Sequence, residues 1–427
     1  MSNGHPVLTV ADAIADHLAH PRVAETLAAG HRWWPHHLAH GAPGIALLHI
    51  ERAAAGLAPW QRVHDWLTYA ARTPLTCGPD SHLNYGAPAL AFVLATVAER
   101  QPGAYRATLN QLDAAIAADA QRRVAENHRR LSAGHRPVLA DFDLVRGVTG
   151  LGVYLLQRMP DSPALAAVLS YLVRLTEPAR HDGLTVPGWW TPVGPHGNAD
   201  DIAFPGGHAN AGVAHGIGGP LALLALAARA GITVPDHATA ITTICAWLDQ
   251  WRIDTPAGSA WPYWVTRDQH RAGPPALHEH PRRPSWCYGT AGLARAQQLA
   301  AIALGDTDRQ HQAEHAVIQA MADPGQRAAT TDSSVCHGYA GMAHLVTRMA
   351  ADASPYAADR LRAVARELLD AVHPPDTDPQ QAAAALLDPT GPGPGLLDGA
   401  AGVALAVHAP VTGTLPQSRW DACLLVS

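Results

Sequence analysis

The sequence predicts an all-α protein, an α/α-toroid in which seven helical repeats form a double ring of helices. Three observations favour this fold class. A Gly-x-x-Gly motif followed by an apolar run recurs seven times along the 427-residue chain. Alanine-rich amphipathic stretches separate the copies. The first and last copies carry the full motif with no polar capping repeat, which favours closure into a ring over an open solenoid.

The motif marks the start of each predicted inner helix. The first glycines of the seven copies are Gly41, Gly86, Gly147, Gly216, Gly289, Gly338 and Gly399. Glycine at a helix entrance permits a tight turn and a close approach of two backbones. The second copy departs from the motif, with Ala89 in place of the second glycine. A single glycine pair is typical of ordinary helix packing, whereas seven copies in register indicate a repeat architecture.

Two kinds of helix are expected in each repeat. The runs that follow the glycines are apolar almost all round, as in a helix enclosed by other helices. Residues 104–126 and 358–372 instead place apolar residues three and four apart, which predicts helices with one exposed face. The sequence therefore predicts an inner and an outer ring.

Two segments, residues 184–212 and 258–284, interrupt the helical pattern. Both are rich in Pro, Gly and Trp, which predicts short extended or hairpin structure, and both lead into a motif copy. They are expected to form walls or a lid at one end of the barrel. No domain boundary stands out, so we expect one domain over residues 1–427, with a small domain inserted between repeats as the open alternative.

Composition limits the classes of function. The chain is 48% hydrophobic and 15% charged, with a net charge of −6, and its basic residues are arginines spread thinly along the sequence. This distribution argues against a nucleic-acid partner. No apolar run approaches the roughly 20 residues that span a bilayer, and no signal peptide is evident. We expect a cytoplasmic protein without a transmembrane segment.

Two of the five cysteines occupy equivalent motif positions. Cys287 and Cys336 each stand two residues before the first glycine of neighbouring copies, and His337 stands one residue before Gly338. His215 holds that same place in the copy before Cys287. Because equivalent positions of a toroid face one axis, these side chains are expected to converge at one rim.

Two cysteines and one histidine form a three-ligand zinc set whose fourth position stays open. Two thiolates and a neutral imidazole balance the charge of Zn²⁺, so a further thiol can bind and lose its proton. The alternative is that both cysteines are ordinary core residues. Outside the motif positions, Cys77, Cys245 and Cys423 are interpreted as structural, and the pairs His36 with His37 and His278 with His280 as solvated loop residues. No disulfide is expected.

Three strings resemble a known family. AHGIGG (residues 214–219), RRPSWCYGTAG (282–292) and SSVCHGYAGMAHL (333–345) are similar to the signatures of the lanthionine synthetase C-like family of lanthipeptide cyclases, whose fold is an α/α-toroid. The resemblance covers essentially the whole chain. The Trp-Cys-Tyr-Gly and Cys-His-Gly signatures are far more specific than any glycine pair.

The resemblance implies a set of site residues. One zinc ion per chain would be bound by Cys287, Cys336 and His337. The family's acid/base histidine corresponds to His215, and its aspartate to Asp143, four residues before Gly147. Its remaining active-site pair corresponds to Arg283 and Tyr288.

The resemblance also implies the reaction. A separate dehydratase converts Ser and Thr of a precursor peptide into dehydroalanine and dehydrobutyrine, and a peptide Cys then adds to the dehydro residue to close a thioether ring. In this scheme His215 protonates the enolate or deprotonates the thiol. Asp143 orients His215, and Arg283 stabilises the developing negative charge. An ordinary ion pair remains the alternative for Asp143 and Arg283, as wall packing does for Tyr288.

Three other functions remain open from the residues alone. Another zinc enzyme that alkylates thiols on an α/α-barrel, such as a prenyltransferase subunit, would need an aromatic-lined lipid pocket, whereas aromatic residues make up 6% of the chain. A scaffold that binds a modified peptide or a partner enzyme would not need an open metal site. A sugar-cleaving toroid would need a pair of carboxylates across a groove, and none stands out in the motifs.

Overall fold

The computed structural model describes residues 5–27, 33–198, 201–256, 258–274, 283–373, 377–388 and 390–427. The chain divides into two compact units. The first unit comprises Met1–Leu112, Thr330–Ala422 and Ser427, and the second comprises Asp113–Ala329 and Cys423–Val426. Each unit is described below by itself.

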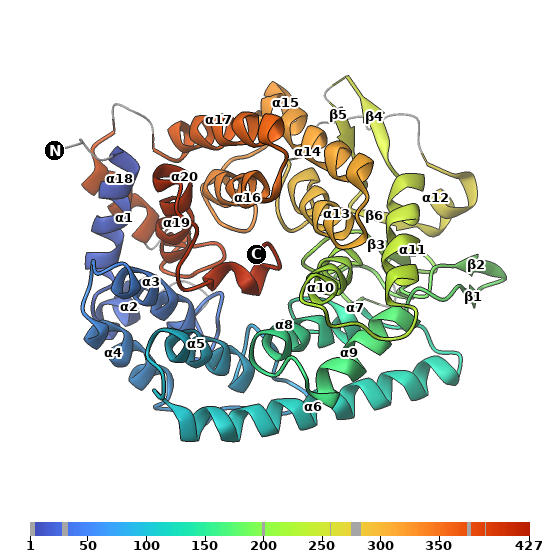
Figure 1. Cartoon of the computed structure of the whole chain (residues 1–427), viewed down its shortest axis with the longest axis horizontal. Coiled ribbons are helices and arrows are strands. Elements are labelled where there is room, and N and C mark those ends of the chain that lie inside the picture. The colour runs from blue at the N-terminus through green and yellow to red at the C-terminus, as the bar shows by residue number, and fades with distance from the viewer. Residues whose placement is uncertain are drawn as a thin grey trace. The chain divides into compact units, whose positions relative to one another are not determined.

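Helices build the first unit. They are α1 (Pro6–His17), α2 (Pro21–Leu27), α3 (Ala42–Ala54), α4 (Trp60–Ala70), α5 (Ala87–Arg100), α16 (Tyr339–Asp352), α17 (Pro355–Val372), α18 (Pro379–Leu387), α19 (Ala400–Ala406) and α20 (His408–Thr412). Two elements cross the division of the chain, namely α6 (Arg106–Ser132) and the 3-10 helix η1 (Trp420–Leu424). Helix α3 packs against α4, and α16 packs against α17 (Figure 1).

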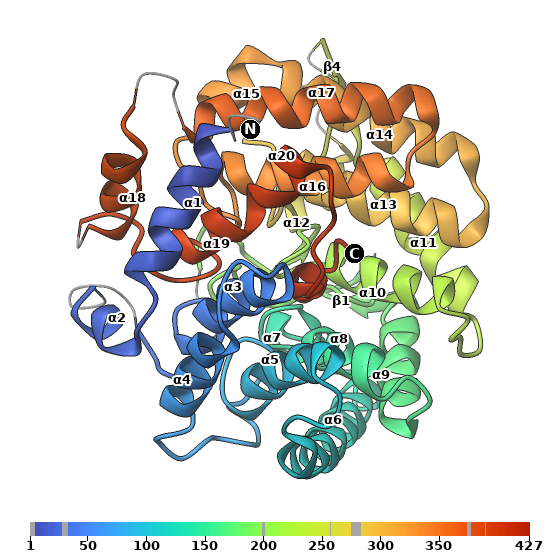
Figure 2. The same ribbon diagram turned by 60° about the vertical axis from the view of Figure 1, so that its left-hand side comes forward.

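The second unit combines helices with short strands. Its helices are α7 (Leu139–Phe142), α8 (Val148–Arg158), α9 (Pro163–Arg174), α10 (Gly218–Arg229), α11 (His237–Gln250), α12 (Arg267–Ala272), α13 (Thr290–Leu304), α14 (Thr307–Ala322) and α15 (Pro324–Ala328). Its strands are β1 (Ala179–His181), β2 (Leu184–Val186), β3 (His208–Asn210), β4 (Ile253–Thr255), β5 (Gly258–Ala260) and β6 (Trp264–Thr266). Helix α10 lies against both α8 and α13, and α13 pairs with α14 (Figure 2).

Every motif copy begins a helix, as the sequence predicts. The first glycine is the residue immediately before α3, α5, α8, α13, α16 and α19, and Gly216 lies two residues before α10. These helices are enclosed: every residue of α5 from Ala87 to Val97 is buried. Outer helices bury one face only. In α17 the buried residues are Ala357, Ala358, Leu361, Ala365, Leu368 and Leu369.

The second glycine of the motif lets the first turn of the helix touch the backbone that precedes it. A Cβ atom on Gly292 would lie 1.9 Å from the carbonyl oxygen of Trp286, six residues earlier. The same clash would arise at Gly341, whose Cβ would lie 2.0 Å from the carbonyl oxygen of Val335. Such distances exclude any side chain. In the second copy, Ala89 at this position is fully buried.

A hydrogen bond joins the turns of successive copies. The donor is the backbone N–H of the third residue before the first glycine of one copy. The acceptor is the carbonyl of the second residue before the first glycine of the next copy. The pairs are Leu144 with Ala214, Val213 with Cys287, Leu38 with Asn84 and Leu396 with Ala39, over 2.8–3.2 Å. The last pair bonds the seventh copy to the first within one unit. These two copies are therefore neighbours, as a closed ring of repeats requires.

Among the described residues, the strands form three two-stranded antiparallel sheets, β1 with β2, β4 with β5, and β3 with β6. Strands β2 and β3 lie in the segment 184–212, and β5 and β6 lie in the segment 258–284, so the prediction of extended structure is confirmed for both. In the β3–β6 pair, His208 faces Thr266 and Asn210 faces Trp264. Residues 275–282, with His278 and His280, lie outside the described residues.

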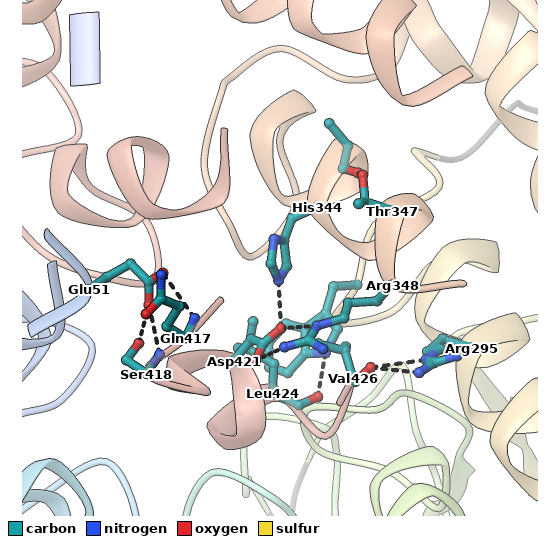
Figure 3. A network of polar contacts seen from close by, with 12 residues as sticks. Glu51, Arg295, His344, Thr347, Arg348, Gln417, Ser418, Asp421, Leu424 and Val426 are labelled. Atoms are coloured by element: carbon teal, nitrogen blue, oxygen red, sulfur yellow. Dashed lines mark hydrogen bonds and ion pairs between the residues drawn. The ribbon is translucent and has the colours of Figure 1, made fainter. Parts of the chain in front are cut away.

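Buried side chains form hydrogen bonds with residues of η1. In the first unit, Asp421 accepts hydrogen bonds from His344 Nε2 over 2.7 Å and from Arg348 Nη2 over 2.8 Å, and all three residues are buried (Figure 3). In the second unit, Trp286 Nε1 donates to the carbonyl of Leu424 over 2.9 Å. Polar groups inside a core must be paired in this way.

The remaining cysteines differ in burial. Cys245 on α11 and Cys423 are buried, whereas Cys77 is exposed. Burial raises the pKa of Cys245 to about 11, so its thiol stays protonated at neutral pH. No helix in the described part of the chain has the length and apolarity needed to cross a bilayer.

Candidate active site and metal site

Cys287 lies in a tight turn that leads into α13 of the second unit. The N–H of Gly289 donates to the carbonyl of Ser285 over 2.9 Å, and the N–H of Tyr288 donates to the Ser285 hydroxyl over 3.4 Å. The same hydroxyl lies 3.6 Å from the sulfur of Cys287. The side chain of Ser285 therefore fixes the turn and touches the thiol that the turn carries.

The turn that carries Cys336 and His337 in the first unit has the same construction. Gly338 N–H donates to the carbonyl of Ser334 over 3.1 Å, and His337 N–H donates to the Ser334 hydroxyl over 3.2 Å. Serine stands two residues before cysteine in both turns. The equivalence of the two cysteines thus has a local structural basis, and the shared Ser-x-Cys spacing is the sequence signal that would have identified both serines.

Cys287, Cys336 and His337 each offer one ligand atom that could bind a metal ion. Both cysteines are buried, with exposed fractions of 8% and 9%, and His337 is half-buried. Two thiolates and an imidazole are typical zinc ligands, whereas magnesium and calcium prefer oxygen. The donor set is therefore consistent with a zinc site.

Asp143 and His215 meet within the second unit. The hydrogen bond from Leu144 to Ala214 joins the residues next to them in the chain. Asp143 Oδ2 lies 2.7 Å from Nδ1 of His215. Asp143 Oδ1 accepts backbone hydrogen bonds from Arg146 over 2.6 Å and from Gly147 over 2.7 Å. The fully buried carboxylate is thus held by the turn before α8 and in turn orients the imidazole.

The geometry of this pair indicates the tautomer of His215. A carboxylate accepts hydrogen bonds, so Nδ1 is the protonated nitrogen of the neutral ring, and Nε2 carries the lone pair. About a third of the His215 side chain is exposed, at 32%. The imidazole is therefore fixed on one side and accessible on the other, as proton transfer to a substrate requires.

Tyr288 lies beside the same histidine. Its ring is stacked on that of His215 with centroids 6.3 Å apart, and its hydroxyl accepts a hydrogen bond from Asn210 over 3.3 Å. A Cβ on Gly212 would lie 2.7 Å from the Tyr288 ring, so glycine is needed there for the ring to approach. The second unit therefore brings Asp143, His215 and Tyr288 together.

Arg283 stands at the start of the Cys287 turn and is half-buried. A Cβ on Gly289 would lie 2.7 Å from the Arg283 carbonyl oxygen, so the backbone of Arg283 is part of the tight turn. The role of its guanidinium group stays a prediction.

The interpretation of His36 and His37 as solvated loop residues is wrong. His36 is buried, and its Nε2 lies 2.8 Å from the Thr73 hydroxyl. His37 Nδ1 accepts backbone hydrogen bonds from Ala39 and His40. Burial, together with the nearby His40, lowers the pKa of His37 to about 3. The His37 imidazole thus holds a turn and the His36 imidazole contacts a distant threonine, and a pattern of polar residues in the sequence does not reveal either contact.

The sequence shows the family to which the chain belongs. A family model described as Lanthionine synthetase C-like protein matches residues 32–425. The chain belongs to the lanthionine synthetase C-like family.

A curated protein sequence and a solved structure are similar to the chain. The nisin biosynthesis protein NisC of Lactococcus lactis subsp. lactis is 25% identical over 207 residues, a match that spans 47% of this chain and 47% of that protein. The chain thus matches about half the length of this curated relative. The solved structure of nisin cyclase superposes with a TM-score of 0.71 at 19% identity, over 95% of this chain and 97% of the other. The fold therefore matches the α/α-toroid of nisin cyclase, which confirms the predicted fold class.

Proposed function

We propose that the protein is a zinc-dependent lanthipeptide cyclase that adds a peptide cysteine to dehydroalanine or dehydrobutyrine and so forms lanthionine or methyllanthionine rings. The observation that carries this proposal is the Cys2His donor set of Cys287, Cys336 and His337 in a chain of this family. Homology to nisin cyclase supports the same reaction class. A pure scaffold would have no use for such a donor set.

The three residues would hold one zinc ion per chain. Bound by two thiolates and a neutral imidazole, zinc would lower the pKa of a further thiol and leave its sulfur electron-rich. The burial of both cysteines suits this role, because a low-dielectric surrounding strengthens the bonds to the metal.

His215 moves the protons of the reaction in this proposal. Attack of the substrate sulfur on the β-carbon forms the C–S bond and breaks the C=C π bond, which leaves an enolate. His215 Nε2 takes up the thiol proton and returns a proton to the α-carbon, so the addition needs no oxidant or reductant. The carboxylate 2.7 Å from Nδ1 stabilises the imidazolium formed between the two transfers.

Arg283 and Tyr288 complete the proposed site. The Arg283 guanidinium would stabilise the negative charge on the enolate oxygen. Tyr288, stacked on His215, would confine the histidine ring and line the substrate position. Binding both reacting groups of one peptide would also lower the entropy cost of ring closure.

The substrate would be a dehydrated precursor peptide, made by a separate dehydratase that we propose as a partner in the cytoplasm. One toroid domain over residues 1–427 remains the domain organisation that we propose. The short strands between α9 and α13 would border the peptide path as the walls or lid that the sequence suggests.

Elemental analysis of the purified protein tests the metal. We expect about one zinc per chain in the wild type and in Cys77→Ala, which removes an exposed thiol outside the motif. Cys336→Ala should lose the zinc or bind it much more weakly. Wild-type protein without zinc, or Cys336→Ala with full zinc, would instead favour a scaffold that binds peptides or partner enzymes.

A further inference from the structure

We propose that Asp332 is a positioning residue that holds His337 through Nε2 and thereby assigns metal binding to Nδ1. Asp332 Oδ2 lies 3.2 Å from Nε2 of His337. A histidine that binds a metal through one nitrogen commonly donates its other N–H to a carboxylate, which fixes the tautomer and makes the ligating nitrogen more basic. This inference rests on the proposed zinc-dependent function.

The Asp332 carboxylate is built into the turn that carries the ligands. Its Oδ1 accepts a hydrogen bond from the N–H of Ser334 over 2.8 Å, and its carbonyl accepts one from Tyr339 over 3.0 Å. A Cβ on Gly338 would lie 2.4 Å from Oδ1, so only glycine lets the carboxylate come so near. Asp332 is thus held at both its side chain and its backbone, and it can fix the plane of the imidazole.

A comparison with His215 shows how specific this arrangement is. His215 and His337 both stand one residue before the first glycine of a motif copy, and both have a carboxylate partner. Asp143 meets Nδ1 of His215, whereas Asp332 meets Nε2 of His337. Opposite nitrogens are therefore left for chemistry, Nε2 in the proposed proton carrier and Nδ1 in the proposed metal ligand.

The place of Asp332 in the motif explains why the neighbouring copy lacks a carboxylate–histidine pair of this kind. Asp332 stands six residues before Gly338, and the equivalent place before Gly289 is Arg283. In that copy the residue before the glycine is Tyr288 rather than histidine, so no imidazole needs a carboxylate. The same motif position is therefore occupied by Asp332, the partner of the ligand histidine, in one copy and by the cationic Arg283 in the other.

The test measures zinc affinity by competition with a chromogenic chelator. We compare wild-type protein, Asp332→Ala, Asp332→Asn and the control Asp359→Ala, which removes a carboxylate that is 84% exposed on α17. Loss of the second partner of a ligand histidine typically weakens metal binding about 10–100-fold, which we expect for Asp332→Ala. Asp332→Asn should weaken it less, because its amide oxygen can still accept the Nε2 hydrogen, and the control should match the wild type.

A second readout separates positioning from a merely structural role. Zinc that binds the folded state raises the melting temperature by an amount set by its affinity. A purely structural effect of Asp332→Ala would lower the melting temperatures of the metal-free and zinc-loaded proteins equally. We expect instead that the zinc-induced rise itself shrinks. Should Asp332→Ala fail to fold, the same two readouts on Asp332→Asn decide.

The outcomes distinguish this inference from the proposed function. Wild-type zinc affinity and an unchanged zinc-induced rise in a folded Asp332→Ala variant would overturn the inference and leave the proposed function standing. A wild-type protein that binds no zinc would overturn both.

Discussion

Asp143 holds His215 through Nδ1 over 2.7 Å, and the same carboxylate accepts two backbone hydrogen bonds from the turn before α8. The orientation of the proposed proton carrier is therefore tied to the start of an inner helix. A substrate that approaches this histidine meets Nε2. The chemistry of the site depends on which nitrogen the carboxylate occupies.

Asp143→Asn removes the charge of this carboxylate and keeps its shape. An amide can donate to Nδ1 and so place the lone pair on the wrong nitrogen, which costs on the order of 100-fold in kcat/KM. The rate of thioether formation measures the effect, and Asp161→Asn, at an exposed position, is the control. Wild-type activity in a folded Asp143→Asn variant would remove Asp143 from the mechanism.

Gly292→Ala should disrupt the turn that carries Cys287. The new methyl group would lie 1.9 Å from the Trp286 carbonyl oxygen, so the first turn of α13 must move. Overpacking of this kind costs roughly 1–3 kcal/mol, and we expect zinc affinity to fall as well. Urea unfolding checks this against Gly78→Ala, where a Cβ meets no heavy atom within 4 Å. Equal stability of the two variants would contradict the close approach.

Asp421→Asn should be strongly destabilising. Burial would raise the pKa of Asp421, but the hydrogen bond from His344 and the charge of Arg348 outweigh it and hold the pKa well below its usual range. Without the carboxylate, a buried arginine loses its partner, which costs roughly 3–5 kcal/mol. The control is Asp359→Asn, whose partner Arg362 is exposed and should contribute under about 1 kcal/mol. Chemical unfolding of both variants measures how much unfolding free energy each one loses. Similar losses in the two variants would argue against the buried network.

Stability should fall as the pH is lowered from about 6.5 toward 4. Burial lowers the pKa of His208 to about 4 from its ordinary value of 6.5, and burial does the same for His49. In this window the unfolded chain binds protons that the folded protein excludes, so each group lowers the unfolding free energy by about 1.4 kcal/mol per pH unit. Urea unfolding at pH 7 and pH 5 measures the slope, which His208→Gln should reduce. An identical slope in both proteins would mean that His208 titrates normally.

The sequence predicted those parts of the structure that repeat. Copies of one motif make each glycine and each cysteine comparable with its equivalents, so the helix starts and the equivalence of Cys287 and Cys336 follow from register alone. The segments without repeats were predicted only as extended. The β3–β6 pairing joins His208 to Thr266 across a helix pair and a hairpin, and no local pattern encodes that partnership.

Residues that hold the site were the least predictable. Asp332 contacts His337 within one turn, and nothing in the sequence distinguishes it from an aspartate of any polar loop. Ser334 could have been found from the Ser-x-Cys spacing that it shares with Ser285. Asp421 lies 73 residues from Arg348, so an arginine in an apolar helix shows only that some partner is needed. Such partners are identified from the three-dimensional structure and not from composition or spacing.

Cyclisation of a synthetic peptide tests the central proposal most directly. The peptide carries one dehydroalanine and one cysteine, and because the addition leaves its mass unchanged, the remaining thiol is counted by alkylation and mass spectrometry. We predict that zinc-loaded wild-type protein consumes the alkylatable thiol far faster than the peptide alone, and that Cys336→Ala does not. A thiol that disappears no faster with the zinc-loaded protein than without it would contradict the assignment of this chain as a cyclase.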